Sequence, residues 1–221
     1  MSLIGMLSVA SCSVYHPELT NIPLMTHRGE TQVTVGVQED VFLLPQLNVD
    51  AAYAFADHFA VQGYVGMSST EFFNTRLAVG YYLPLAHQAV AEVYVGGGYG
   101  RSDYQRQKTG DWYLMGYEPV FAQVNFGWTD LLPVHLDVGA SCKVGAFAFD
   151  GTDNYNSEPK AVNGTYGMVE PQLFVRLGGS RVKFQIQGGY NWFWDPKSEA
   201  GKALAFTFCP LAVGVGVNFR F

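Results

Sequence analysis

The sequence is poor in charged residues and has no long apolar run. Charged side chains make up 14% of its 221 residues, against about 25% in an average soluble domain, which is too few for an ordinary water-facing surface. The net charge of -6 provides no basic surface for nucleic acid. No stretch of about 18 apolar residues occurs, which disfavours membrane-spanning helices. The three cysteines, Cys12, Cys142 and Cys209, are too far apart for a zinc site or a disulfide framework. We therefore expect no nucleic-acid partner, no metal and no cofactor.

Strand periodicity runs through the rest of the chain. From Gln32 onward, apolar residues recur at every second position between turn-forming clusters. This pattern predicts an all-β protein, an antiparallel up-and-down transmembrane β-barrel over residues 31–221. It has about ten strands, or eight if the short first strand or another weak one does not span. The expected strands are 32–38, 46–55, 59–67, 75–83, 88–99, 117–128, 134–147, 168–177, 181–192 and 211–221.

The connections between these strands alternate in length. Short turns are expected at 56–58, 84–87, 129–133 and 178–180, and long or polar loops at 39–45, 68–74, 100–116, 150–167 and 193–210. Short turns at one rim and long loops at the other are typical of transmembrane barrels, whose short turns face the periplasm. Both termini then belong to the periplasmic side. Oxygen-bearing residues at 150–154 resemble a calcium loop but lack the bidentate Glu of an EF-hand, so we expect a solvated loop there.

The two faces of each strand differ in a way that suits a narrow lumen. In the last strand Leu211, Val213 and Val215 alternate with Ala212 and Gly214, and the polar faces are rich in Gly, Tyr, Gln and Asn. A soluble barrel would instead need many Lys, Glu and Thr. Aromatic girdles are expected near the strand ends. They comprise Phe55, Phe59, Tyr81, Trp128 and Phe221 at the short turns, and Phe72, Phe73, Tyr99, Tyr117, Phe149, Tyr166, Trp192 and Trp194 at the loops.

Charges of both signs fall on the inward face. They are Asp50, Arg76, Glu92, Asp137, Lys143, Glu170, Arg176, Lys183 and Arg220. Arg176 and Lys183 flank a short turn and are expected to lie nearly opposite one another, where like charges repel. Asp137 and Glu92 are the acidic partners at that level. We therefore expect a lumen plugged by charge pairs rather than an open pore.

The N-terminus carries a lipoprotein-like signal. Val9-Ala10-Ser11-Cys12 has the small residues and the cysteine that a bacterial lipoprotein signal peptidase requires. Residues 1–11 are then a signal-peptide remnant, and Cys12 is the lipidated first residue of a periplasmic tether over residues 12–30. That segment contains Pro17 and Pro23 and has no periodicity. The alternative is an ordinary cysteine in an unrelated leader.

Both ends of the chain resemble known outer-membrane proteins. Tyr15-His16-Pro17, Asn21-Ile22-Pro23-Leu24 and Gly29-Glu30 resemble the opening of small outer-membrane β-barrels of the Bacteroidota type. The closing strand, with Phe219 and the terminal Phe221, resembles the sorting signal that the barrel-insertion machinery recognises. The resemblance implies a Gram-negative outer membrane, with its lipids and this machinery as partners.

Function is open among three classes. The first is a non-catalytic structural or scaffold barrel, or a subunit of a larger outer-membrane complex. The second is a narrow, porin-like channel or small-solute uptake barrel. The third is an enzyme of the omptin or lipid A-modifying kind, which the histidine positions disfavour. His16 and His27 lie in the tether, His58 and His87 lie in short turns, and His135 lies just inside the seventh expected strand on the periplasmic side. All five are far from an outward-facing active site. We expect no catalysis.

Overall fold

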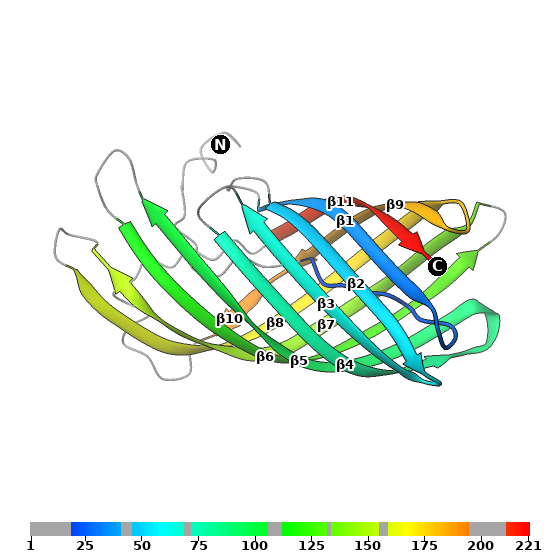
Figure 1. The fold of residues 1–221 in the computed structure, drawn as a ribbon, viewed down its shortest axis with the longest axis horizontal. Coiled ribbons are helices and arrows are strands. Elements are labelled where there is room, and N and C mark those ends of the chain that lie inside the picture. The colour runs from blue at the N-terminus through cyan, green and yellow to red at the C-terminus, as the bar shows by residue number, and fades with distance from the viewer. Residues whose placement is uncertain are drawn as a thin grey trace, which may run out of the picture.

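Ten antiparallel strands close into a barrel in the computed structural model of the protein (Figure 1). The structure describes residues 19–40, 46–68, 72–105, 112–131, 134–154, 159–194 and 211–221. Its elements are β1 (Thr31–Asp40), β2 (Gln46–Ala56), β3 (Phe59–Ser68), β4 (Phe72–Pro84), the short 3-10 helix η2 (Ala86–Gln88), β5 (Ala89–Gln105), β6 (Trp112–Leu131), β7 (Leu136–Asp153), β8 (Lys160–Gly178), β9 (Val182–Tyr190), β10 (Trp192–Trp194) and β11 (Leu211–Arg220).

The barrel closes between the first and last strands. Each strand from β1 to β9 pairs with its neighbours in sequence, and β11 pairs with both β9 and β1. The short β10 follows β9 after Asn191 and also pairs with β8. It therefore continues β9 in the barrel wall. Closure gives the first and last strands partners on both sides, and a closed sheet lets a β-structure span a bilayer. The expected ten-stranded barrel is confirmed.

The central strands are longer than the sequence pattern predicts. β5 to β8 contain 17, 20, 18 and 19 residues, whereas β1 to β4 contain 10 to 13. Most of the loops expected at 100–116 and 150–167 is therefore strand, and residues 150–153 pair with 160–163 rather than forming a solvated loop. The expectation fails because outward residues such as Arg101, Asp103 and Asp150 are polar and exposed here. The apolar alternation stops although the pleat continues.

The outer surface of the barrel carries an apolar band. Leu77, Val120 and Leu173 are 65%, 63% and 68% exposed, and Val, Leu and Ile side chains cover the outward face of every long strand. Such a surface is stable against lipid chains rather than water. Among the described residues no helix is long and apolar enough to cross a membrane.

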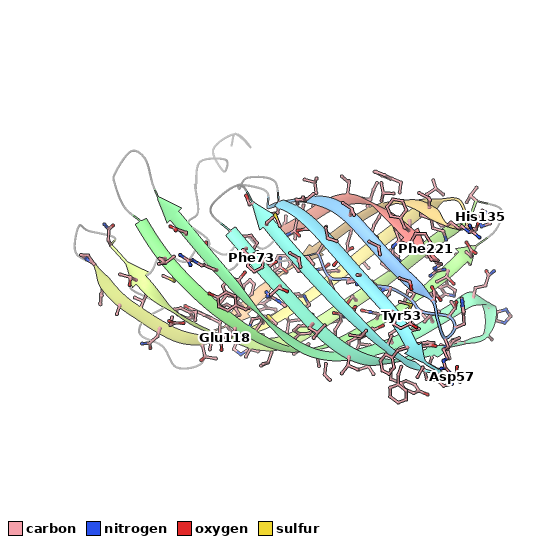
Figure 2. The ribbon with its side chains drawn as sticks, viewed as in Figure 1. Tyr53, Asp57, Phe73, Glu118, His135 and Phe221 are labelled. Carbon is pink, nitrogen blue, oxygen red and sulfur yellow. The ribbon has the colours of Figure 1, made fainter. Side chains whose placement is uncertain are left out.

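Aromatic side chains border this apolar band. Figure 2 shows Tyr53 and Phe221 toward the short-turn end and Phe73 toward the long-loop end. The exposed aromatics also include Phe55, Phe59, Tyr81 and Trp128 at the former and Tyr99, Trp192 and Trp194 at the latter. Phe72, Tyr117, Phe149 and Tyr166 were expected in the girdle but are 1–6% exposed and face the lumen. They sit at alternate positions from the outward residues, so the pleat turns them inward.

Beyond the long-loop girdle the outward face becomes polar. Arg101, Asp103, Glu118, Asp150 and Asn163 are all exposed on β5 to β8. Such side chains are expensive in hydrocarbon and stable in water. The four long strands thus project past the apolar band at their long-loop ends. We call these projecting parts of β5 to β8, which begin after Tyr99 on β5 and include Glu118 on β6, the water-exposed extension.

The apolar band predicts a depth-dependent response to charge. Leu77 lies on β4 midway between Phe73 and Tyr81, so Leu77→Arg should lower the free energy of unfolding by about 2–4 kcal/mol in lipid vesicles. Asn163→Arg, outward on the extension, should change it by less than about 0.5 kcal/mol. Denaturant titration of folded protein in vesicles measures both. Equal effects of the two variants would contradict the placement of the band.

Candidate functional site

The lumen is occupied by the chain segment that precedes β1. Leu19, Thr20, Ile22, Leu24 and Met25 are 0–8% exposed, and the dark blue segment in Figure 1 runs behind β1 and β2 before it turns into β1. We call residues 19–25 the lumen segment. It fills the space that an open pore would need.

The barrel wall holds the lumen segment mainly by its main chain. Side chains from six strands reach inward, and most of the bonds engage backbone N–H or C=O groups of the segment. The donors and acceptors are Leu19 N to Gln38 Oε1 (2.8 Å), Thr20 N to Gln172 Oε1 (2.8 Å), Gln187 Nε2 to Thr20 O (2.8 Å), Gln123 Nε2 to Asn21 O (2.7 Å), Arg176 Nη2 to Ile22 O (2.7 Å), Gln32 Nε2 to Pro23 O (2.5 Å), Arg220 Nη2 to Leu24 O (3.2 Å) and Met25 N to Glu92 Oε1 (2.7 Å).

The lumen segment corrects the expectation of a solvated periplasmic tether for residues 19–25. Residues 19–25 lie inside the barrel, while Cys12 and residues 13–18 lie outside the described residues. Lack of periodicity suggested a solvated chain, but polar wall side chains satisfy the backbone of an irregular segment as well as water does. The available signal was composition, because Leu19, Ile22, Leu24 and Met25 are too apolar for a solvated tether.

A buried carboxylate fixes the turn between the lumen segment and β1. Glu30 is 0% exposed; it accepts hydrogen bonds from Thr26 N (2.8 Å) and Gln32 Nε2 (2.9 Å) and pairs with Arg220 Nε (2.8 Å). Gly29 has a φ of 86°, a left-handed conformation that glycine adopts without strain. The chain thus reverses at the short-turn end of the barrel, held to the last strand by an ion pair.

The structure places all nine charged residues expected on the inward face within the lumen wall. Eight of them are at most 7% exposed, and the Arg220 side chain is 16% exposed. Lys183 Nζ lies 2.5 Å from Asp137 Oδ1 and 2.9 Å from Asp130 Oδ1, and Lys143 Nζ lies 3.2 Å from Glu170 Oε2. Lys143 and Glu170 lie opposite one another on β7 and β8, and the Lys183–Asp137 pair joins β9 to β7.

Arg176 and Glu92 have hydrogen-bond partners other than those expected from the sequence. Arg176 lies opposite Gln185 and donates to its Oε1 (2.6 Å), and Lys183 lies opposite Gly178, so the two cations are not opposite one another. Glu92 accepts from Asn125 Nδ2 (2.8 Å) as well as from the lumen segment. The lumen segment lies between Glu92 and Arg176 and gives each of them a backbone partner.

Aromatic side chains cluster on the inward face of β6, β7 and β8 beyond the lumen segment, toward the long loops. Tyr166 stacks on Phe147 and Phe149 with centroid distances of 5.7 and 5.5 Å, and Phe147 contacts Tyr117 and Phe193 edge to face at 6.2 and 5.9 Å. Side chains at Gly98 and Gly100 of β5 would overlap Arg76 and Tyr117. The glycines therefore make room for large neighbours, and do not line an open lane.

A small polar recess remains beside the lumen segment. Asn21, Tyr64, Arg76, Gln123 and Lys143 are among its lining residues, and its empty volume of 240 Å³ includes open solvent. Arg76 lies with its guanidinium 5.6 Å from the Tyr117 ring centroid and donates to Thr75 O (2.9 Å). The recess has room for about one ordered water.

The ionisable residues of the described part offer no metal cluster, because no group of three His, Cys, Asp or Glu side chains there could hold an ion. His58, His87 and His135 lie at the short turns, and His27 precedes β1 near Glu30; Figure 2 labels His135 at that rim. Cys142 is a half-buried free thiol. His16 and Cys209 lie outside the described residues.

Comparison with known proteins supports the architecture. No protein-family model and no curated protein sequence matches the chain. The outer-membrane protease OmpT of Escherichia coli superposes with a TM-score of 0.56 at 6% identity, over 87% of this chain and 93% of that one. The fold is that of an outer-membrane β-barrel. The N-terminal barrel domain of Pseudomonas aeruginosa OprF (TM-score 0.43, 9% identity, 89% and 100% covered) and the KdgM porin in complex with disordered oligogalacturonate (0.40, 10%, 87% and 99%) are also similar. Identities this low relate folds and not activities.

The C-terminal strand of the barrel is paired on both sides. Phe219 lies opposite Val33 and Val182, and Phe221 exchanges backbone hydrogen bonds with Thr31 at 2.9 and 3.0 Å. The expected sorting residues thus also close the barrel. Their recognition by the insertion machinery stays a prediction.

The Lys183 ion pairs predict unequal effects of two neighbouring aspartates. Asp137→Ala should lower the free energy of unfolding by about 3 kcal/mol, because it removes a fully buried partner. Asp130→Ala should lower it by less than about 1 kcal/mol, because Asp130 is 40% exposed. The temperature at which the folded band disappears on a gel compares the stability of the two variants with that of the parent. An Asp137→Ala barrel as stable as its parent would disprove the structural role of the pair.

Proposed function

We propose that the protein is a plugged, non-catalytic β-barrel of the bacterial outer membrane. It acts as a structural or scaffold element, or as a subunit docked against a larger outer-membrane complex. One observation carries this proposal: the lumen segment fills the barrel and is hydrogen-bonded from several sides of the wall. A solute pathway would require this segment to leave the lumen, and the polar groups of the wall would then lose the hydrogen bonds that they make with it.

The surface of the barrel supports both the location and the orientation. The apolar band between aromatic girdles suits a bilayer, and the water-exposed extension follows one girdle only. In outer-membrane barrels the long-loop end faces the exterior and the short turns face the periplasm. We place this protein in the same way. The extension then offers a polar surface outside the cell for a partner protein.

Catalysis is not part of the proposal. The described histidines lie at the short-turn end, away from the extension, and a general base must be within hydrogen-bond reach of its substrate. The protease activity of OmpT belongs to that protein. Co-purification from native membranes tests the subunit role, since a stable partner distinguishes a complex subunit from a solitary barrel.

The plugged lumen predicts that the protein does not conduct ions. The full chain in planar bilayers should show no steady conductance, whereas a variant that begins at Thr26, and so lacks the lumen segment, should conduct. The full-length Cys12→Ala variant is the control for altered attachment and should be silent. Steady conductance of the unmodified chain would favour the second candidate, a narrow channel or small-solute uptake barrel.

We also propose that Cys12 is lipidated, on the grounds of Val9-Ala10-Ser11-Cys12. Cells fed a radioactive fatty acid should label the wild-type protein and leave Cys12→Ala unlabelled. The matched control is Cys142→Ala, which removes a thiol of the barrel wall and should keep full labelling. Equal labelling of Cys12→Ala and wild type would rule the lipid out.

A further inference from the structure

The lumen segment has a direction. Leu19 N bonds Gln38, near the long-loop end of β1, and a side chain at Gly214, which pairs with Gln38, would overlap Leu19. At its other end the chain turns at Gly29, and Glu30 pairs with Arg220 beside the short turns. The segment therefore descends from the long-loop side to the short-turn side before β1 ascends again.

The chain before Leu19 has one route out of the barrel. The wall is a closed ring of hydrogen-bonded strands, so a chain cannot pass through it sideways. Between Leu19 and the short-turn end, the lumen holds the rest of the segment together with the buried rings of Tyr82, Tyr94 and Phe174. A second strand of chain returning to the short turns would overlap these groups, because protein interiors are close-packed.

We propose that the chain before Leu19 leaves the barrel on the long-loop side, so that the protein threads its own N-terminus through its lumen. With the orientation proposed above, on which this step rests, residues 12–18, which remain after cleavage before Cys12, are presented at the cell surface. Cys12 lies seven residues before Leu19, within about 23 Å at about 3.3 Å per residue. A lipid on Cys12 then enters the outer leaflet of the membrane, not the periplasmic one.

Epitope tags at three sites test the threading in intact cells. One tag is inserted after Ser13, which keeps Cys12 and its neighbour, a second in the connection between β5 and β6, and a third between Gly179 and Ser180. Antibody binding to intact cells is measured against permeabilised cells. The tag after Ser13 should be accessible together with the β5–β6 tag, and the tag at Gly179 only after permeabilisation.

The outcomes separate the threading from the orientation. If the Ser13 tag is accessible only under the conditions that expose the Gly179 tag, and not the β5–β6 tag, the threading is wrong. If the Gly179 tag alone is accessible on intact cells, the proposed orientation is wrong, while the threading stands because the Ser13 and β5–β6 tags still behave alike.

A disulfide tests the lumen segment without tags. In a chain whose three native cysteines are replaced by Ser, Leu19→Cys with Gly214→Cys should lose both free thiols and change gel mobility, because the side chains at these positions meet. Leu19→Cys with Val213→Cys is the control, since Val213 points outward and is 49% exposed; it should keep both thiols. If the double variant does not fold, Leu19→Cys alone keeps the test, because its thiol should resist maleimide until the barrel is unfolded. A folded barrel with a freely reactive thiol at position 19 overturns the proposal.

Discussion

The interior of this barrel depends on the hydrogen bonds between its wall and the backbone of residues 19–25. A narrow barrel that spans a bilayer turns one face of every strand to lipid and must therefore place its polar side chains inward. Buried amides and charges are stable only with partners. The lumen segment supplies them as main-chain N–H and C=O groups, for example Thr20 O to Gln187 and Ile22 O to Arg176.

This arrangement explains why the charges form no single network. Lys143 pairs with Glu170 across the neighbouring strands β7 and β8, and Lys183 on β9 pairs with Asp137 on β7, whereas Glu92 and Arg176 each engage the lumen segment. An ion pair needs its partner at one distance and angle, but an extended backbone offers groups along its whole length. The wall thus binds an irregular segment, including Pro23, that no strand could accommodate in register.

The same closed geometry connects the interior with the function that we propose. A filled lumen disfavours transport and leaves the outer surfaces for interaction, above all the polar extension of β5 to β8. The filled lumen also leaves the chain before Leu19 a single route out of the barrel. The plugging, and the scaffolding and surface presentation that we propose, therefore all depend on a single packed segment.

The sequence by itself determined the barrel, because the period of two with an apolar outer face is a local property of each strand, as in Leu211, Val213 and Val215. It also placed the nine lumen charges on the correct face. Only the tertiary structure decided what fills the lumen and how far the strands extend. Residues 19–25 have no period to read, and their partners, such as Gln172 and Arg176, lie more than 150 residues away. The extension was hidden since strand pairing continues in water, where outward residues such as Asp103 are polar and the apolar signal ends. Burial of an irregular segment and pairing beyond the membrane are long-range properties, and no local pattern encodes them.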